Sequence, residues 1–335
     1  MPRLGRLHIV GGYYHVMGRG LERRDIFKTK EDKEDLLSRL AAGLEATHSQ
    51  CMAWAILSNH YHLLIRVSAI ALSQLMSKVL SGYATQYNRR HRRVGYVFQN
   101  RYKSILCDEE AYFLEMVRYI HINPLKAKIV KTLSELDQYR WTGHAGIMGN
   151  HFRAWQARDE VLSRFGRRID AARRHYRAFI NDGLHSPADI DYEGGGLIRS
   201  YGGWQNIQEK RAHHEARIGD ERILGESKFV EQALKEDELQ IEAQTRLKRS
   251  GWTLEKLIKN VCQSYGVPPE YITHKGRVNA LSTVKALICY WGTTKLGVSS
   301  TEISIRLNIS QPAISQASKR GLRYCLDNEI EMEVR

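Results

Sequence analysis

The chain lacks the features of a secreted or membrane-bound protein. Its 335 residues include only five cysteines, and no two of them form a CxxC pair. An odd number of scattered cysteines indicates a reduced, cytoplasmic chain with neither a disulfide framework nor a zinc module. No apolar run approaches membrane-spanning length, and the first residues lack the apolar segment of a signal peptide. We therefore expect no membrane partner.

Two further shortages concern phosphate loops and acidic residues. No GxxxxGK[ST] loop occurs, which argues against an ATPase of the P-loop class. Acidic residues number 37 against 51 basic ones, giving a net charge of +14 and a pI near 9.5. A chain this basic is most simply explained by a polyanionic partner, usually nucleic acid. A merely basic surface or an acidic membrane face are the alternatives.

The most informative stretch is the apolar, β-prone run 53–65, which contains two histidines one residue apart. Side chains alternate between the faces of a strand, so His60 and His62 should project together while Tyr61 points away. Two imidazoles on one sheet face can hold a divalent cation and leave coordination positions open to substrate. The alternative is an ordinary pair of strand histidines, one buried and one solvated.

Basic residues accompany two other predicted strands. Tyr13–Met17 is expected to be a strand that ends in a sharp Gly-Arg-Gly turn, where Arg19 and Arg23 can cradle a phosphate. A plain strand-ending turn is the alternative. In residues 95–106 a strand is expected in which aromatics such as Tyr102 alternate with Arg101 and Lys103. That composition suits stacking on bases and pairing with phosphates, although a structural sheet edge would look similar.

Helical spacing over Glu109–Ile122 predicts a helix whose apolar face covers the sheet. Tyr119 and Asn123 stand four residues apart, so their side chains can reach one point. Because Pro124 disfavours helical geometry in the residue before it, Asn123 should lie at the helix end. The alternation of strands and helices with short links predicts an α+β fold, with helices on one face of a mainly antiparallel sheet.

The second half of the chain reads as helical. Residues 146–249 are rich in charge and are expected to form a basic helical connector, which either lies along DNA or is a solvated helix pair. Residues 250–323 form an apolar-periodic unit ending in a helix, a turn at Asn308 and a second helix over Gln311–Arg320, stopped by Gly321. This pattern is typical of a helix-turn-helix that enters the major groove, with an ordinary helical hairpin as the alternative. Its expected DNA-contacting residues are Ser310, Gln311, Ser315, Gln316, Lys319 and Arg320.

Together these parts suggest a tyrosine that attacks phosphorus beside a bound cation. The phenol oxygen of Tyr119 would displace a DNA 3′-OH, and the phosphotyrosine bond would keep the energy needed for rejoining. A cation would withdraw charge from the non-bridging oxygens and fix the in-line geometry. Mg²⁺ prefers oxygen ligands, so Mn²⁺ suits a shell of two imidazoles and an amide at least as well.

Several motifs, in order, resemble one family. His60-Tyr61-His62 within Leu57–Leu64 is similar to the HUH motif of single-strand transposases, and their REP-associated tyrosine transposase branch is the nearest match. Gly95–Leu106 resembles its G-x-x-F-Q-x-R-Y-K segment, and Arg118–Ala127 resembles its R-Y-I-H-x-N-P-x-x-A segment. The resemblance covers roughly residues 8–145. It departs from the pattern at Tyr61, which is bulkier than the usual aliphatic residue and needs room or a hydroxyl partner.

This resemblance implies a ferredoxin-like core and specific residue roles. Tyr119 would be the nucleophile that forms a 5′-phosphotyrosine, His60 and His62 metal ligands, and Asn123 the third ligand. Arg118 and Lys126 join Arg19, Arg23, Arg101, Tyr102 and Lys103 as expected DNA contacts. Relatives include both dimers and monomers, so a homodimer is one possibility.

Residues 250–323 resemble, more weakly, the C-terminal DNA-binding domain of the replication initiator DnaA. In this chain Ser300-Thr301-Glu302-Ile303 would open the helix-turn-helix of that domain. The resulting division is a transposase/nuclease domain (1–145), the connector (146–249), the helix-turn-helix domain (250–323) and a tail (324–335).

The favoured function is a metal-dependent, Mg²⁺- or Mn²⁺-using transposase and nickase that cleaves and rejoins single-stranded, hairpin-forming DNA. Duplex DNA would bind the helix-turn-helix, and the protein would be cytoplasmic and nucleoid-associated. One alternative is a catalytically silent DNA-binding regulator on the same fold. Another is a metal-dependent nuclease that uses water, with Tyr119 merely structural.

Overall fold

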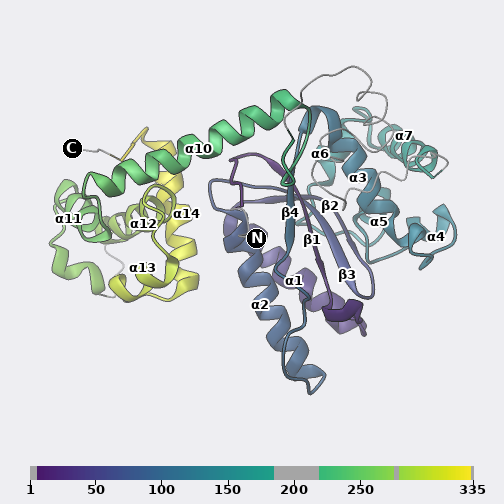
Figure 1. Ribbon diagram of the computed structural model, residues 1–335, viewed down its shortest axis with the longest axis horizontal. Coiled ribbons are helices and arrows are strands. Elements are labelled where there is room, and N and C mark those ends of the chain that lie inside the picture. The colour runs from purple at the N-terminus through teal and green to yellow at the C-terminus, as the bar shows by residue number, and fades with distance from the viewer. Residues whose placement is uncertain (1–5, 185–218, 275–278, 333–335) are drawn as a thin grey trace. The chain divides into compact units, whose positions relative to one another are not determined.

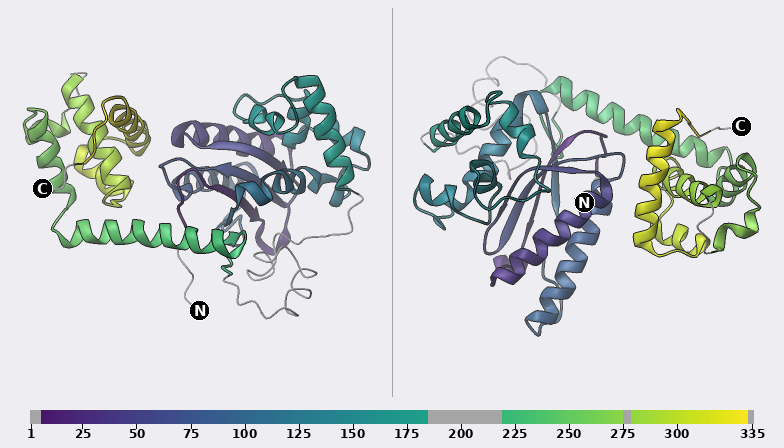
Figure 2. Two further views of the ribbon diagram at one scale, coloured as in Figure 1. Left: turned by 90° about the horizontal axis from the view of Figure 1, so that it is seen from above. Right: turned by 180° about the vertical axis from the view of Figure 1, so that it is seen from behind.

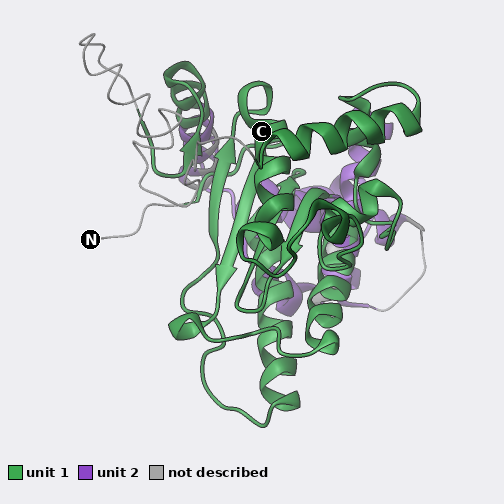
Figure 3. Ribbon diagram, turned by 90° about the vertical axis from the view of Figure 1, so that its right-hand side faces the viewer, with its two compact units in different colours: residues 1–45, 49–235 green, residues 46–48, 236–335 purple. Residues whose placement is uncertain are grey.

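The structure is a computed structural model that describes residues 6–184, 219–274 and 279–332 (Figure 1). The chain divides into two compact units, which comprise residues 1–45 with 49–235 and residues 46–48 with 236–335 (Figure 3). The first unit is built on a β-sheet, whereas the second is helical. Each unit has a hydrophobic core of its own.

The sheet of the first unit has five strands in the order β2-β3-β1-β4-β5. Their bounds are β1 Tyr13–Arg19, β2 Gln50–Ile56, β3 His60–Arg66, β4 Lys103–Cys107 and β5 Ile223–Leu224. All neighbouring pairs are antiparallel except β4 and β5, which run parallel. The apolar run that contains the two histidines is therefore a hairpin of β2 and β3, and β1 lies beside β3 at the centre of the sheet.

Helices cover both faces of this sheet (Figures 1 and 2). On one face, α1 (Lys30–Thr47) and α2 (Leu72–Arg90) pack against strand residues such as Trp54 and Tyr61. On the other face, α3 (Glu109–Lys126) packs against residues such as Ala53 and Leu64. The expected α+β class and the mainly antiparallel sheet are confirmed. The prediction that helices cover only one face of the sheet is wrong. Both faces of the central strands are apolar, so each needs a cover.

The helix α1 begins where the sequence predicts it. Asp32 accepts hydrogen bonds from the backbone amides of Lys28 and Thr29, both at 3.0 Å, and the Thr29 hydroxyl accepts from the Asp32 amide at 3.3 Å. These bonds satisfy amides that a helix start leaves without partners. The Asp32 carboxylate is fully buried and also pairs with Arg90 and His91 at the end of α2. One side chain thus joins the start of α1 to the end of α2.

The helix α3 runs further than expected. Asp108 caps it by accepting from the Glu110 amide at 3.1 Å, and the helix continues through Pro124 to Lys126. The proline has no N–H for the carbonyl of Ile120. The side-chain amide of Asn123 donates instead to the carbonyls of Tyr119, at 2.8 Å, and Ile120, at 3.5 Å. The expectation that Asn123 ends the helix is therefore wrong.

The expected strand over residues 95–106 is mostly a loop. Only Lys103–Cys107 pairs as β4, whereas the preceding residues turn at Gly95, whose φ is +91°. Within this loop Phe98 makes a single bridge to Gly20. The loop consequently lines α2 and touches the end of β1 through the Gln99 amide, which donates to the Arg19 carbonyl at 3.0 Å, before regular pairing begins at Lys103.

Much of the predicted connector packs onto the sheet. Four short helices follow α3, namely α4 Leu133–Asp137, α5 Gly143–Met148, α6 Arg158–Ser163 and α7 Ile169–Asp182. Ile147, Val161 and Tyr176 belong to the same buried cluster as α3. After the residues that lie outside the described part, β5 extends the sheet and α10 (Ser227–Arg249) follows it. The connector 146–249 is thus divided between the two units.

The second unit contains α11 Leu254–Ser264, η2 Pro269–Thr273, α12 Asn279–Thr294, α13 Ser300–Leu307 and α14 Gln311–Asp327. Ser299 caps α13 by accepting from the Glu302 amide at 3.1 Å, and Ser310 caps α14 by accepting from the Ala313 amide at 3.4 Å. Asn308 makes the turn between them at a φ of +50°. These features agree with the sequence prediction of two helices joined by a tight turn.

The prediction that Gly321 stops the second of these helices is wrong. The helix α14 continues past Gly321 to Asp327. A Cβ on this glycine would lie 2.2 Å from the carbonyl oxygen of Ala286 in α12. Gly321 is therefore required for the close approach of two helices, and it does not act as a terminator.

Candidate active site

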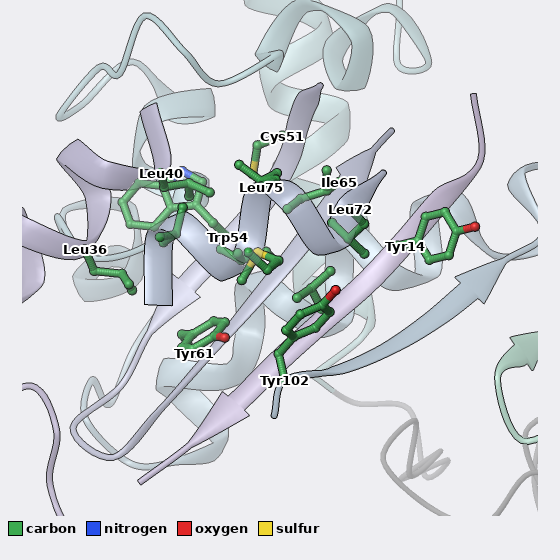
Figure 4. Close-up of a cluster of buried hydrophobic side chains, with 14 of the residues drawn as sticks. Tyr14, Leu36, Leu40, Cys51, Trp54, Tyr61, Ile65, Leu72, Leu75 and Tyr102 are labelled. Atoms are coloured by element: carbon green, nitrogen blue, oxygen red, sulfur yellow. The ribbon is translucent and has the colours of Figure 1, made fainter. Parts of the chain in front are cut away.

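The two histidines of β3 project from the same sheet face, as predicted. Their ring centroids lie 5.2 Å apart, His62 is fully buried and His60 is half-buried. Tyr61 points to the opposite face, into the core that contains α1 and α2 (Figure 4). The strand period of two therefore produces the expected imidazole pair.

Tyr61 obtains its room from a glycine on the neighbouring strand. Gly18 is its partner across the β1–β3 pair, and a Cβ at Gly18 would lie 2.6 Å from the Tyr61 hydroxyl. Tyr61 is fully buried, and its hydroxyl has no hydrogen-bond partner among the described residues. The requirement noted from the sequence is thus met for the ring but not for the hydroxyl.

A third histidine, which the sequence analysis missed, completes this cluster. His15 of β1 is fully buried, and its Nε2 lies 2.9 Å from Nδ1 of His62. The two rings are stacked, with centroids 5.2 Å apart. The available signal was the alternation in β1, which places His15 on the same face as Tyr13 and Met17. Reading it required knowing that β1 and β3 are neighbours.

Tyr119 of α3 lies against these histidines. Its ring centroid is 5.7 Å from that of His15 and 5.8 Å from that of His62, and it meets both edge-on. The tyrosine is half-buried, and the Lys126 ammonium lies 5.9 Å from its ring centroid. The structure therefore brings the predicted nucleophile together with the histidine cluster.

The imidazoles of His60 and His62 are held neutral. Burial lowers the pKa of His60 to about 4, with the Arg19 cation acting in the same direction. Burial also places the pKa of His62 well below its ordinary value, and His15, His60 and Arg19 add to this effect. A neutral imidazole has one nitrogen with a lone pair, which is the form that binds a metal.

Neighbouring groups select which nitrogen of His60 carries the proton. The side-chain amide of Asn59 donates to the Arg23 carbonyl at 2.9 Å, so its oxygen faces Nδ1 of His60 at 2.6 Å. An amide oxygen only accepts, and therefore His60 is protonated at Nδ1 and has its lone pair at Nε2. Asn59 thus acts on His60 as outer partners act on metal-ligating histidines.

His60 and His62 open onto a pocket of about 190 Å³ with basic walls. Arg19, Arg101 and Lys103, all predicted DNA contacts, line it. The remaining lining residues are Met17, Gly18, Gln99 and Asn100. Three cations around two neutral imidazoles suit an anionic ligand of the size of a phosphodiester.

The other predicted DNA contacts of this unit lie elsewhere. Arg23 lies in the turn after β1 and Tyr102 is buried, with the Arg6 guanidinium 3.9 Å from its ring centroid. Arg118 pairs with Glu115 and lies 4.4 Å from the ring centroid of Phe179. Tyr102 therefore does not offer an open face to a base in this structure.

The predicted metal ligands fit a cation in part. Neutral His60 and His62 provide nitrogen donors beside a pocket, and Asn123 is buried one helical turn after Tyr119. The Asn123 amide nitrogen is used by the backbone, which leaves its oxygen as the atom suited to a cation. The described residues contain no group of three or more His, Cys, Asp or Glu side chains placed to hold a metal.

A buried hydrogen-bond chain, also missed from the sequence, holds the other side of α3. Asp137 accepts from His144 Nε2 at 2.8 Å, so neutral His144 must accept at Nδ1 from the Tyr176 hydroxyl, 2.9 Å away. The hydroxyl oxygen then accepts from Nδ1 of His121 at 2.8 Å. Burial lowers the pKa of both histidines, which agrees with their neutral forms. Residues of α5 and α7 thereby fix α3 from the side opposite Tyr119.

The structure describes the side chains of only some of the DNA-contacting residues predicted in the second unit. Ser310 is the cap of α14, Gln316 and Arg320 are exposed, and Lys319 is half-buried. The side chains of Gln311 and Ser315 lie outside what the structure describes. The DNA-binding role of α13 and α14 stays a prediction.

A protein family and a solved structure are similar to parts of this chain. The model of a family described as "Transposase IS200 like" matches residues 8–123, which include the three histidines, Tyr119 and Asn123. This match supports, over those residues, the resemblance that the motifs indicate. Among solved structures, the chain is similar to one described as the REP-associated tyrosine transposase bound to a REP hairpin. The identity is 18%, the TM-score is 0.38, and the match covers 47% of this chain and 90% of that one.

The comparison with curated proteins found no match. None of the helices in the described ranges is long and apolar enough to cross a membrane.

Proposed function

We propose that this protein is a metal-dependent DNA transposase and nickase that cleaves and rejoins single-stranded, hairpin-forming DNA through a 5′-phosphotyrosine at Tyr119. The observation that carries this proposal is the edge-on contact of Tyr119 with His15 and His62, beside a basic pocket that His60 and His62 line. The family match over residues 8–123 supports it.

The reaction exchanges one phosphoester for another. The Tyr119 oxygen loses its proton and forms a bond to phosphorus, the bond to the DNA 3′-oxygen breaks, and that oxygen takes up a proton and leaves as a 3′-OH, so no proton is gained or lost overall. Rejoining is the reverse, with a 3′-OH as the attacking group. Arg19, Arg101 and Lys103 neutralise the phosphate and hold it in the pocket. The half-buried Tyr119 ring, packed against two imidazoles, is oriented before substrate binds.

His60, His62 and the Asn123 side-chain oxygen would hold the cation, which when bound polarises the phosphate oxygens. Mn²⁺ and Mg²⁺ are both compatible with this set. His15 would favour the tautomer of His62 that is protonated at Nδ1 and leaves Nε2 for the cation. We further propose that α13 and α14 bind duplex DNA, in keeping with the likeness to the DnaA C-terminal domain, and that a homodimer is compatible with this function.

The test is the formation of a covalent protein–DNA adduct on hairpin DNA with Mn²⁺. Tyr119→Phe should abolish the adduct and retain DNA binding, because only the nucleophilic oxygen is lost. Tyr112→Phe is the matched control on the same helix, since Tyr112 is also half-buried, and it should behave as wild type.

The result also separates the competing functions. Unchanged cleavage by Tyr119→Phe would show that water attacks the phosphate, and a wild-type chain that binds but never cleaves would indicate a regulator. His60→Ala and His62→Ala should each abolish cleavage while duplex binding persists. Normal cleavage by either variant would contradict the metal assignment.

A further inference from the structure

A second and larger hollow adjoins the histidine pocket. It has a volume of about 720 Å³ and lies between α2 and the loop of residues 95–102. We name it the α2 groove. Gln99, Asn100 and Arg101 line both the α2 groove and the histidine pocket. Because the same three residues contact both hollows, the two hollows lie on either side of one short segment, which spans about 10 Å at most when extended.

The wall formed by α2 has two parallel stripes. Met76, Leu80 and Ala84 recur every four residues and line the groove with apolar side chains, of which Met76 is buried and Leu80 and Ala84 are half-buried. Beside them, at the same spacing, three exposed serine hydroxyls can donate and accept hydrogen bonds, and these are Ser73, Ser77 and Ser81. A ligand with a flat apolar body and polar edges would satisfy both stripes.

The opposite wall supplies an aromatic ring and positive charge. Tyr96 on this wall is 83% exposed. Arg6 and Arg101 line the groove, and none of its lining residues is acidic. Basic residues beside an exposed aromatic are the combination that binds single-stranded nucleic acid, where bases stack and phosphates pair with cations.

We propose that the α2 groove binds an unpaired nucleotide of the same DNA strand whose phosphate occupies the histidine pocket. The inference rests on the proposed function, because that function places a single strand in the adjoining pocket. Stacked nucleotides in one strand advance by about 3.4 Å each, so the nucleotide in the groove lies within roughly three positions of the scissile phosphate. The groove would therefore select the strand beside the cleavage site.

The experiment uses the full-length chain and single-stranded DNA oligonucleotides with a hairpin, each carrying one 2-aminopurine at a different position of the unpaired flank. We expect the emission to change on binding at one or two positions near the cleavage site. Ser77→Glu puts a carboxylate in the groove. It should remove this local change and weaken binding about tenfold or more, the size of one lost base-stacking contact. Thr85→Glu makes the same charge change at an exposed site of α2 outside the groove and should bind as wild type.

The outcomes distinguish this inference from the proposed function. If wild type forms the Tyr119 adduct but Ser77→Glu leaves emission and affinity unchanged, the groove inference is overturned alone. The same holds if Ser77→Glu alters only the oligomeric state in sedimentation, which would assign the groove to a second copy. If no adduct forms and Ser77→Glu still removes a local change, the groove binds a base and the cleavage proposal fails.

Discussion

At the scale of single residues, Tyr61 shows how the strand that holds the histidines is anchored. Its ring fills the core between the sheet and the helices α1 and α2, and Gly18 leaves space for it. The cost lies in the hydroxyl, which is buried without a hydrogen-bond partner among the described residues. A buried donor of this kind destabilises the folded state.

Tyr61→Phe should therefore raise the free energy of unfolding by about 1 to 3 kcal/mol, because it removes an unsatisfied hydroxyl and keeps the ring. Gly18→Ala should lower it, since the new Cβ would meet the Tyr61 ring. Urea unfolding of both variants measures these changes. Loss of stability in Tyr61→Phe would mean that the hydroxyl has a partner.

Single residues also show which parts of the candidate site could be predicted from the sequence. The pairing of His60 with His62 was predictable because alternation along a strand is local. The cluster with His15 was not, because it depends on which strand lies beside β3. Asn123 was predicted at a helix end because Pro124 disfavours helical geometry in the residue before it. The helix continues instead, and the side-chain amide of Asn123 donates to the Ile120 carbonyl that the proline cannot serve. A tertiary neighbour decided the case of His15, whereas a side-chain bond within the helix itself decided that of Asn123.

At the scale of elements, a buried carboxylate joins two helices. Asp32 caps α1 and pairs with Arg90 and His91 of the segment that ends α2. Burial alone would raise the pKa of this carboxyl, but hydrogen bonds from His91, Arg90 and the Thr29 amide outweigh it, and the pKa is lowered. The charged form is therefore the one that the fold stabilises.

The sign of the resulting pH dependence follows. Because the pKa in the folded state is below that in the unfolded chain, near 3.9, the stabilisation is present above about pH 4 and is lost as the pH falls through the folded-state value. Asp32→Asn should be less stable than wild type at neutral pH, and the difference should shrink in acid. Urea midpoints measured across this range test it, and a difference that is constant with pH would contradict it.

Helix packing in the second unit depends on one glycine. Gly321 meets a backbone carbonyl of α12, which cannot rotate away as a side chain can. Gly321→Ala should lower the stability of this unit by about 1 to 3 kcal/mol, as overpacking does. Gly292→Ala is the control, because its Cβ would meet only flexible side chains, those of Ile303 at 3.1 Å and Leu254 at 3.8 Å. Thermal unfolding of the two variants gives the comparison, and equal stabilities would refute the packing role.

The short helices after α3 show why residues 146–182 were predicted to be part of a connector although they pack against the sheet. Residues 143–182 are rich in charge, and their short helices bury few side chains each. Their contribution to the first unit comes from a few buried groups, such as Ile147, Val161 and Tyr176. The chain from Asp137 through Tyr176 to His121 has no sequence motif, since its members are brought together only by the fold.

At the scale of the whole molecule, a net charge of +14 is shared between two units with separate cores. The charge predicted a nucleic-acid partner but not which part binds which form of it. The proposed function places the single strand on the first unit, around the histidine pocket, and duplex DNA on α13 and α14 of the second.

Arg320→Ala tests this division. Arg320 is exposed on α14, and its loss should weaken duplex binding and reduce the slope of log affinity against log salt by about 1, as for one lost phosphate contact. Adduct formation on hairpin DNA at low salt should be unchanged. Lys295→Ala, an equal charge change at an exposed site outside both helices, is the control. Equal effects of the two variants on the duplex would assign binding to general charge.

The wall shared by the histidine pocket and the α2 groove also bears on inhibition. A small molecule seated in the larger hollow would press on Gln99, Asn100 and Arg101 without touching either imidazole of β3. Such a compound would disturb the proposed phosphate site and leave the proposed cation ligands untouched. Its potency would then not depend on metal concentration, unlike that of a chelating inhibitor.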